Sequence, residues 1–146
     1  MERQLVFDLP NELDCIEEAV AFVMRRCAQC EVVARRLRLN FRVSLTEALA
    51  NAMIYGNGSD PTKRVRVEIR IENGAIQARV TDEGQGFDPE VVPDPTLPFL
   101  PQGEGGRGLF LMRRLMDEVR YNDRGNSVTL VLRLDDDRGL QNGVSA

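Results

Sequence analysis

Alternation between apolar and charged residues predicts a β-hairpin in the middle of the chain. From Val65 to Ile71 every second residue is apolar and the residues between them are charged, which is typical of a strand with one buried and one wet face. Asn73-Gly74 follows, a strong short-range hairpin signal. A second alternating run, from Ala75 to Thr81, predicts the antiparallel return strand.

Apolar residues spaced by three and four predict three helices. The first is expected from an N-cap at Asn11 to about Cys30, with a buried stripe of Leu13, Ile16, Val20, Val23, Cys27 and Cys30. The second is expected from an N-cap at Asn40 to a stop at Gly56-Asn57, with a stripe of Phe41, Leu45, Ala48, Leu49 and Ala52. The third carries Leu109, Leu111, Met112, Leu115 and Met116.

Three further strands complete the pattern. Gln4 to Leu9 is expected to form a strand ended by Pro10. Val119 to Asn122 and Ser127 to Leu134 are expected to form two more, joined by a turn at residues 123–126. Residues 1–134 are therefore expected to form one domain, and the acidic and small polar residues 135–146 a frayed tail.

Composition excludes few functions but sets the cellular context. The chain has 146 residues, is 42% hydrophobic and 29% charged, and carries a net charge of −4, which argues mildly against nucleic-acid binding. It has no apolar run long enough to cross a membrane and no signal peptide, so a cytoplasmic protein is expected. Cys27 and Cys30 form C-x-x-C, but the chain has no histidine and one further cysteine. A closed zinc site is disfavoured, and both cysteines are expected in the core.

Glu47 and Asn51 are the first candidate chemical groups. They are four residues apart on the second helix, so their side chains share one face beside the buried stripe. A carboxylate can take a proton, and an amide oxygen can bind a hard cation such as Mg²⁺. A solvated helix face has the same pattern, so this pair needs support from elsewhere in the chain.

Glycines downstream supply that support. Gly103, Gly105, Gly106 and Gly108 precede the third helix, where backbone N–H groups and the helix dipole favour a phosphate, with Arg107 as a cationic contact. The alternative is that these glycines form a plain hinge. Asp82 ends a strand and can accept a hydrogen bond from an exocyclic amine; the alternative is an ordinary turn aspartate. Five prolines between Asp88 and Gln102 exclude a regular helix or central strand there and predict a long loop that is either functional or disordered.

The order of these motifs resembles the GHKL superfamily, the ATP-binding fold (Bergerat fold) of gyrase, histidine kinases and MutL. Glu47 and Asn51 match its E-x-x-x-N motif, and residues 103–108 match its G-x-G-G-x-G motif before a helix. Its D-x-G-x-G motif is matched by Asp82, Gly84 and Gly86. The resemblance further places Thr129 near the adenine. It implies an α/β two-layer sandwich in which three helices cover one face of a mixed, mostly antiparallel sheet, with residues 83–105 as the ATP lid.

Within the superfamily, S-L-T-E-A-L-A-N-A over residues 44–52 and the small size look most like bacterial anti-sigma-factor serine/threonine kinases. This resemblance implies ATP and Mg²⁺ as cofactors, an antagonist protein as substrate and a sigma factor as a further partner. Glu47 would be catalytic, Asn51 the Mg²⁺ ligand, and Asp82, Gly84 and Gly86 the adenine contacts. Members of that group usually form homodimers, which the sequence leaves open.

Two departures and two alternatives accompany the resemblance. Tyr55 stands where relatives often carry histidine, and the lid is rich in proline. A histidine kinase is disfavoured because the chain contains no histidine. A nucleotide-controlled partner-binding switch with little or no kinase activity would carry the same binding motifs. Slow ATP hydrolysis without a protein substrate would need the same site, with water in place of serine.

Overall fold

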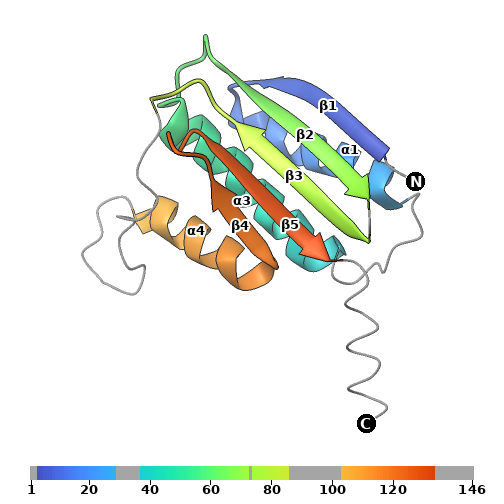
Figure 1. Ribbon diagram of the computed structural model, residues 1–146. Helices are drawn as coiled ribbons and strands as arrows, with labels where there is room; N and C mark the ends of the chain where they lie inside the picture. The colour runs from blue at the N-terminus through green and yellow to red at the C-terminus, as the bar shows by residue number, and fades with distance from the viewer. Residues whose placement is uncertain (1–2, 29–36, 73, 86–102, 134–146) are drawn as a thin grey trace.

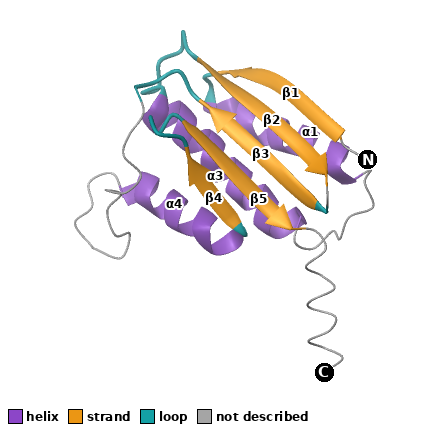
Figure 2. Ribbon diagram, viewed as in Figure 1, coloured by secondary structure: helices purple, strands orange, loops and turns teal. Residues whose placement is uncertain are grey.

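The fold is a five-stranded sheet with helices covering one face (Figure 1). The structure is a computed structural model, and it describes residues 3–28, 37–72, 74–85 and 103–133. The strand order is β1-β2-β3-β5-β4, and every pairing between described strands is antiparallel. The predicted two-layer sandwich is confirmed, and its described strands are wholly antiparallel where a mixed sheet was expected. Figure 2 shows the helices in one layer behind the strands.

The strands follow the alternation in the sequence. Their bounds are β1 Arg3–Pro10, β2 Arg64–Glu72, β3 Ala75–Thr81, β4 Glu118–Tyr121 and β5 Ser127–Arg133. The predicted hairpin is confirmed: β2 and β3 pair with Val67 opposite Val80 and Ile69 opposite Ala78. Gly74 has a φ of 73°, a conformation that glycine adopts at little cost. Asn73 lies outside the described residues.

The helices are α1 Ile16–Ala28, α3 Arg42–Asn51 and α4 Gly103–Leu115. A 3₁₀ turn, η1 Leu13–Cys15, precedes α1, and π-helical turns flank α3 as η2 Leu37–Phe41 and η3 Ala52–Gly56. The glycine segment expected as a loop before the third helix is the beginning of α4 itself. None of the described helices is long and apolar enough to cross a membrane.

Both predicted N-caps are wrong. Asn40 lies inside η2, because helical structure begins earlier than expected, and its amide donates to the Leu115 carbonyl at 2.8 Å. Glu12 occupies the N-cap position of η1, while Asn11 is buried and bonds to distant backbone groups. Leu13, expected in the core, is 53% exposed because it lies in the 3₁₀ turn rather than in the helix.

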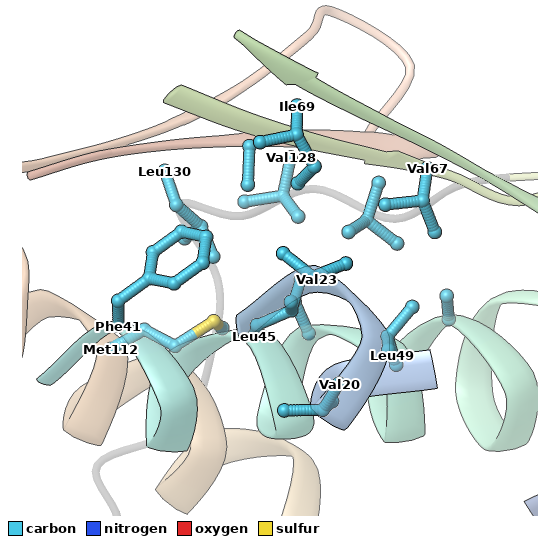
Figure 3. Close-up of a cluster of buried hydrophobic side chains, with 14 of the residues drawn as sticks. Val20, Val23, Phe41, Leu45, Leu49, Val67, Ile69, Met112, Val128 and Leu130 are labelled. Atoms are coloured by element: carbon cyan, nitrogen blue, oxygen red, sulfur yellow. The ribbon is translucent and has the colours of Figure 1, made fainter. Parts of the chain in front are cut away.

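The core fills the space between the sheet and the helices (Figure 3). The predicted stripe of the second helix is buried throughout, and Cys27 is only 1% exposed, which confirms its place in the core. Figure 3 shows side chains of α1, η2, α3 and α4 on one side of this space and inward side chains of the strands on the other. The labelled residues are Val20, Val23, Phe41, Leu45, Leu49, Val67, Ile69, Met112, Val128 and Leu130. Cys30, residues 86–102 of the predicted lid and the predicted tail lie outside the described residues.

Candidate functional site

Helix α3 holds Glu47 and Asn51 on one face. Ala48 and Leu49 are buried against the sheet, which fixes the rotation of the helix and leaves Glu47 and Asn51 half-buried beside the core. Neither side chain forms a hydrogen bond to another described residue, so a carboxylate and an amide stand one turn apart with their polar atoms available. The sequence prediction that they share a face is confirmed.

Helix α4 meets this pair at Gly108. A β-carbon at Gly108 would lie 2.7 Å from Glu47 Oε1 and 3.0 Å from Asn51 Nδ2. These distances are shorter than ordinary van der Waals contact, so a side chain at this position would push the ends of the Glu47 and Asn51 side chains aside. The first and third sequence motifs therefore meet in one place, although more than fifty residues separate them.

The backbone of Gly103, Gly105, Gly106 and Arg107 forms the beginning of α4. The first N–H groups of an α-helix have no partner within the helix, and the helix dipole makes its N-terminus favourable for anions. The side chain of Arg107 lies outside the described part of the chain, so its contact with phosphate stays a prediction.

The second motif lies at the end of β3. Asp82 is 8% exposed, and its Oδ1 accepts a hydrogen bond of 2.8 Å from the Gly84 N–H. Burial raises the pKa of the Asp82 carboxyl; the Gly84 N–H and the positive charges of Lys63 and Arg124 partly oppose that shift. No described residue donates a hydrogen bond to the other oxygen, Oδ2, and a buried carboxylate of this kind is suited to accept a hydrogen bond from a ligand.

The Asp82 loop packs directly on the end of the central helix. A β-carbon at Gly84 would overlap the Gly56 carbonyl, and one at Gly56 would overlap the Asp82 carboxylate. Glycine is therefore required at both positions for β3 and η3 to approach. The consequence is that Asp82 lies beside the C-terminal end of the same helical segment that carries Glu47 and Asn51.

Thr129 is not brought to this cluster. In the sheet register it lies opposite Arg79 and Arg120, both exposed, whereas its neighbours Val128 and Leu130 point into the core. Since side chains alternate along a strand, Thr129 is on the face away from the helices. This placement corrects the expectation that it lies near an adenine. Gly86 lies outside the described residues.

The buried asparagines Asn11 and Asn57 were missed as site residues. Asn57 was taken only as a helix stop, yet its Oδ1 accepts a 2.7 Å hydrogen bond from the Glu83 N–H, next to Asp82. Tyr121 is a further neighbour: burial raises its pKa to about 12, opposed by Arg113 and reinforced by Asp82. An inward position at the end of a strand is the only sequence signal that could have suggested Tyr121.

The donor groups fit magnesium better than a metal held by the protein alone. No group of three or more His, Cys, Asp or Glu side chains that could hold a metal occurs among the described residues. Mg²⁺ characteristically takes one or two protein oxygens together with phosphate oxygens and water. The amide oxygen of Asn51, beside the start of α4, is suited to such a role.

Comparisons with known proteins find related sequences and a similar fold. Residues 9–132 match the family described as histidine kinase-like ATPase domain. The serine-protein kinase RsbW of Bacillus licheniformis is 31% identical over 115 residues, covering 70% of this chain and 72% of that protein. The anti-sigma F factor of Geobacillus stearothermophilus is 36% identical over 89 residues, covering 60% of this chain and 61% of that protein.

Two further matches define the limits of the likeness. RsbW of Oceanobacillus iheyensis is 30% identical over 91 residues, and the match covers 58% of each chain; the chain thus spans less than two thirds of some of these relatives. A solved histidine kinase domain from Erythrobacter litoralis EL346 matches with a TM-score of 0.51 at 19% identity, over 69% of this chain and 46% of that one, which supports the fold. The chain belongs to the histidine kinase-like ATPase family and, within it, to the anti-sigma-factor kinase type.

Proposed function

We propose that this chain is an ATP-dependent serine/threonine protein kinase of the anti-sigma-factor type, which phosphorylates a small antagonist protein and sequesters a sigma factor. The observation that carries the proposal is the approach of Gly108 to Glu47 and Asn51. It joins a carboxylate, a metal-ligand candidate and the phosphate-favouring start of a helix. Catalysis of phosphoryl transfer consists mostly of such positioning and charge stabilisation.

In this proposal the nucleotide base lies at the Asp82 end of the site. The Asp82 carboxylate accepts a hydrogen bond from the adenine amine, and its buried position makes the match selective. Gly84 and Gly86 are the further adenine contacts in this proposal. A guanine presents a carbonyl at the same place, and two facing acceptors in a buried site cost about 1–3 kcal/mol.

The phosphates lie at the other end, between α3 and α4. The glycine segment of residues 103–108 allows backbone N–H groups to approach a phosphate, and Arg107 adds a positive charge. Asn51 contributes its amide oxygen to Mg²⁺, which when bound offsets the negative charge of the phosphates.

Glu47 acts on the acceptor. Its carboxylate orients the serine hydroxyl and takes the proton as the serine oxygen bonds to the terminal phosphorus and the bond from that phosphorus to the ADP oxygen breaks. The half-buried position of Glu47, with no hydrogen bond to another described residue, supports this role because a base must be free to receive a proton. The protein substrate and the sigma factor are proposed because similar proteins are named serine-protein kinase and anti-sigma F factor.

The test is transfer of labelled terminal phosphate from ATP to candidate proteins encoded next to this chain's gene. We expect one of them to be labelled on serine in a Mg²⁺-dependent reaction. If none is labelled but the affinity of a partner differs between ADP and ATP, the chain is a nucleotide-controlled switch and the kinase proposal fails. ATP hydrolysis without any labelled protein would instead identify a simple ATPase.

A further inference from the structure

Two buried asparagines lie behind the Asp82 loop and belong to none of the three motifs. Asn57, which follows η3, is 2% exposed, and Asn11, which follows β1, is 7% exposed. Asparagine is mostly a surface residue, and a buried amide is costly unless its donors and acceptor find partners. The partners of these two side chains therefore indicate what they hold in place.

Asn57 bonds to three different segments. Its Oδ1 accepts the 2.7 Å hydrogen bond from the Glu83 N–H, and its Nδ2 donates to the Arg64 carbonyl at 3.0 Å and to Asn11 Oδ1 at 3.1 Å. Reversing the amide would set its NH₂ group against the Glu83 N–H and its oxygen against the Arg64 carbonyl. The orientation is thus determined by its partners, and only a carboxamide satisfies all three.

Asn11 anchors Asn57 from the other side. Its Nδ2 donates to the Asp60 carbonyl at 2.9 Å and to the Met53 carbonyl at 3.3 Å, which leaves its Oδ1 for Asn57. Glu83 also bonds to the start of β2: its Oε1 accepts a 3.0 Å hydrogen bond from the Arg64 N–H. The two asparagines therefore tie the loop after β3 to β1, to η3 and to the start of β2.

These bonds fix the peptide group that carries Asp82. The Asp82 carbonyl and the Glu83 N–H belong to one planar peptide unit. Asn57 holds its N–H end, and the Asn126 Nδ2 holds its carbonyl end at 3.3 Å. With both ends held, the direction of the Asp82 side chain is set by the surrounding fold.

We propose that Asn57, anchored by Asn11, is a specificity-determining positioning residue, whose carboxamide holds the Asp82–Glu83 peptide so that the Asp82 carboxylate selects a base with an exocyclic amine. The inference rests on the proposed function, which assigns base recognition to Asp82. It adds that selectivity depends on a side chain that does not touch the nucleotide.

The experiment measures the affinities of ATP and GTP by calorimetry in the wild type, Asn57→Ala and Asn40→Ala. The wild type is expected to prefer ATP by roughly tenfold to a hundredfold. Asn57→Ala frees the Asp82 loop, so ATP affinity falls while GTP affinity stays within about twofold, and the ratio drops to about threefold or less. Asn40→Ala is the matched control: it also loses an amide-to-carbonyl bond, to Leu115, but its preference for ATP should be that of the wild type.

Several results would overturn the inference. A folded Asn57→Ala variant with the wild-type ratio, or with equal losses for both nucleotides, removes the specificity role. If Asn57→Ala does not fold, Asn11→Ala carries the test, because it leaves the bond to Glu83 and removes the anchor; a fall of about threefold in the ratio supports the inference and an unchanged ratio rejects it. A wild type that binds ATP and GTP equally would instead refute the assignment of Asp82 on which the inference rests.

Discussion

Gly108→Ala tests whether the close approach of α4 to α3 sets the position of the Glu47 carboxylate. The variant adds one methyl group, whose carbon would lie 2.7 Å from Glu47 Oε1, 3.0 Å from Asn51 Nδ2 and 3.5 Å from Asn51 Oδ1. Non-bonded heavy atoms settle at about 3.5 Å or more. The Glu47 carboxylate must therefore retreat by roughly 0.5–1 Å, and the Asn51 amide by somewhat less.

The fold should tolerate this change. The displaced atoms are the ends of flexible side chains without hydrogen bonds to described residues, and alanine in place of glycine favours a helix by roughly 0.5–1 kcal/mol. Catalysis should not tolerate it, because a displacement of about 1 Å can reduce a rate by about a hundredfold. We expect an unchanged or slightly higher melting temperature together with a rate of phosphotransfer that falls roughly tenfold to a hundredfold.

Single-turnover transfer at saturating ATP measures the chemical step apart from binding. The control is the same substitution in a Glu47→Gln background, where the methyl group has no catalytic carboxylate left to displace, so the two losses should not add. A folded Gly108→Ala variant with the wild-type rate would show that Gly108 does not adjoin Glu47 in the reacting complex. Equal losses in both backgrounds would show that the methyl group acts elsewhere.

Three further predictions concern the Asp82 end of the site. Because burial raises the Asp82 pKa above its usual value of 3.8, ionisation costs stability as pH rises through that folded-state pKa. Asp82→Asn should therefore be more stable than the wild type towards urea at neutral pH. The variant should lose this advantage near pH 3, and it should also lose the preference for ATP. Gly56→Ala places a methyl group against the Asp82 carboxylate. It should lower the free energy of unfolding by roughly 1–3 kcal/mol and weaken ATP binding. An unchanged free energy of unfolding together with an unchanged ATP affinity would contradict the packing described. In a Tyr55→Phe background Tyr121 is the one remaining tyrosine, and ultraviolet titration should find its pKa at about 12. The free energy of unfolding should fall as pH rises from about 10 to 12. A midpoint near 10 would show that Tyr121 is not buried.

Local patterns in the sequence predicted most of the helices and strands and the arrangement of the Glu47–Asn51 pair. Alternation from Val65 to Ile71 and the following turn were enough for the hairpin, because both signals act between near neighbours. Helical spacing was enough to put Glu47 and Asn51 on one face. The order of the motifs was enough to expect that they meet, although the contact through Gly108 required the observed packing of α4.

Long-range partners explain what the sequence did not predict. Asn11 and Asn40 have the residue type of an N-cap, but their amides bond to carbonyls 42 to 75 residues away along the chain. No local rule distinguishes these two uses of asparagine. The prediction for Thr129 came from resemblance alone and did not consider which face of the sheet its side chain occupies. Val128 and Leu130 on either side of it are buried, so Thr129 lies on the opposite face.

Glu47→Gln provides the most direct test of the central claim, which is that Glu47 is the base for phosphotransfer in a site that binds Mg²⁺-ATP independently of it. The variant keeps the size and helix propensity of glutamate and removes the base, so nucleotide affinity should stay within a few fold of the wild type. Asn51→Ala is the contrasting variant, because loss of a metal ligand should weaken Mg²⁺-ATP binding as well as turnover.

The decisive measurement is the single-turnover rate of phosphate transfer from saturating Mg²⁺-ATP to the protein substrate, in the wild type and in Glu47→Gln. The account predicts a fall of roughly a hundredfold to ten-thousandfold, the contribution of a positioned general base. Transfer by Glu47→Gln at the wild-type rate would contradict it.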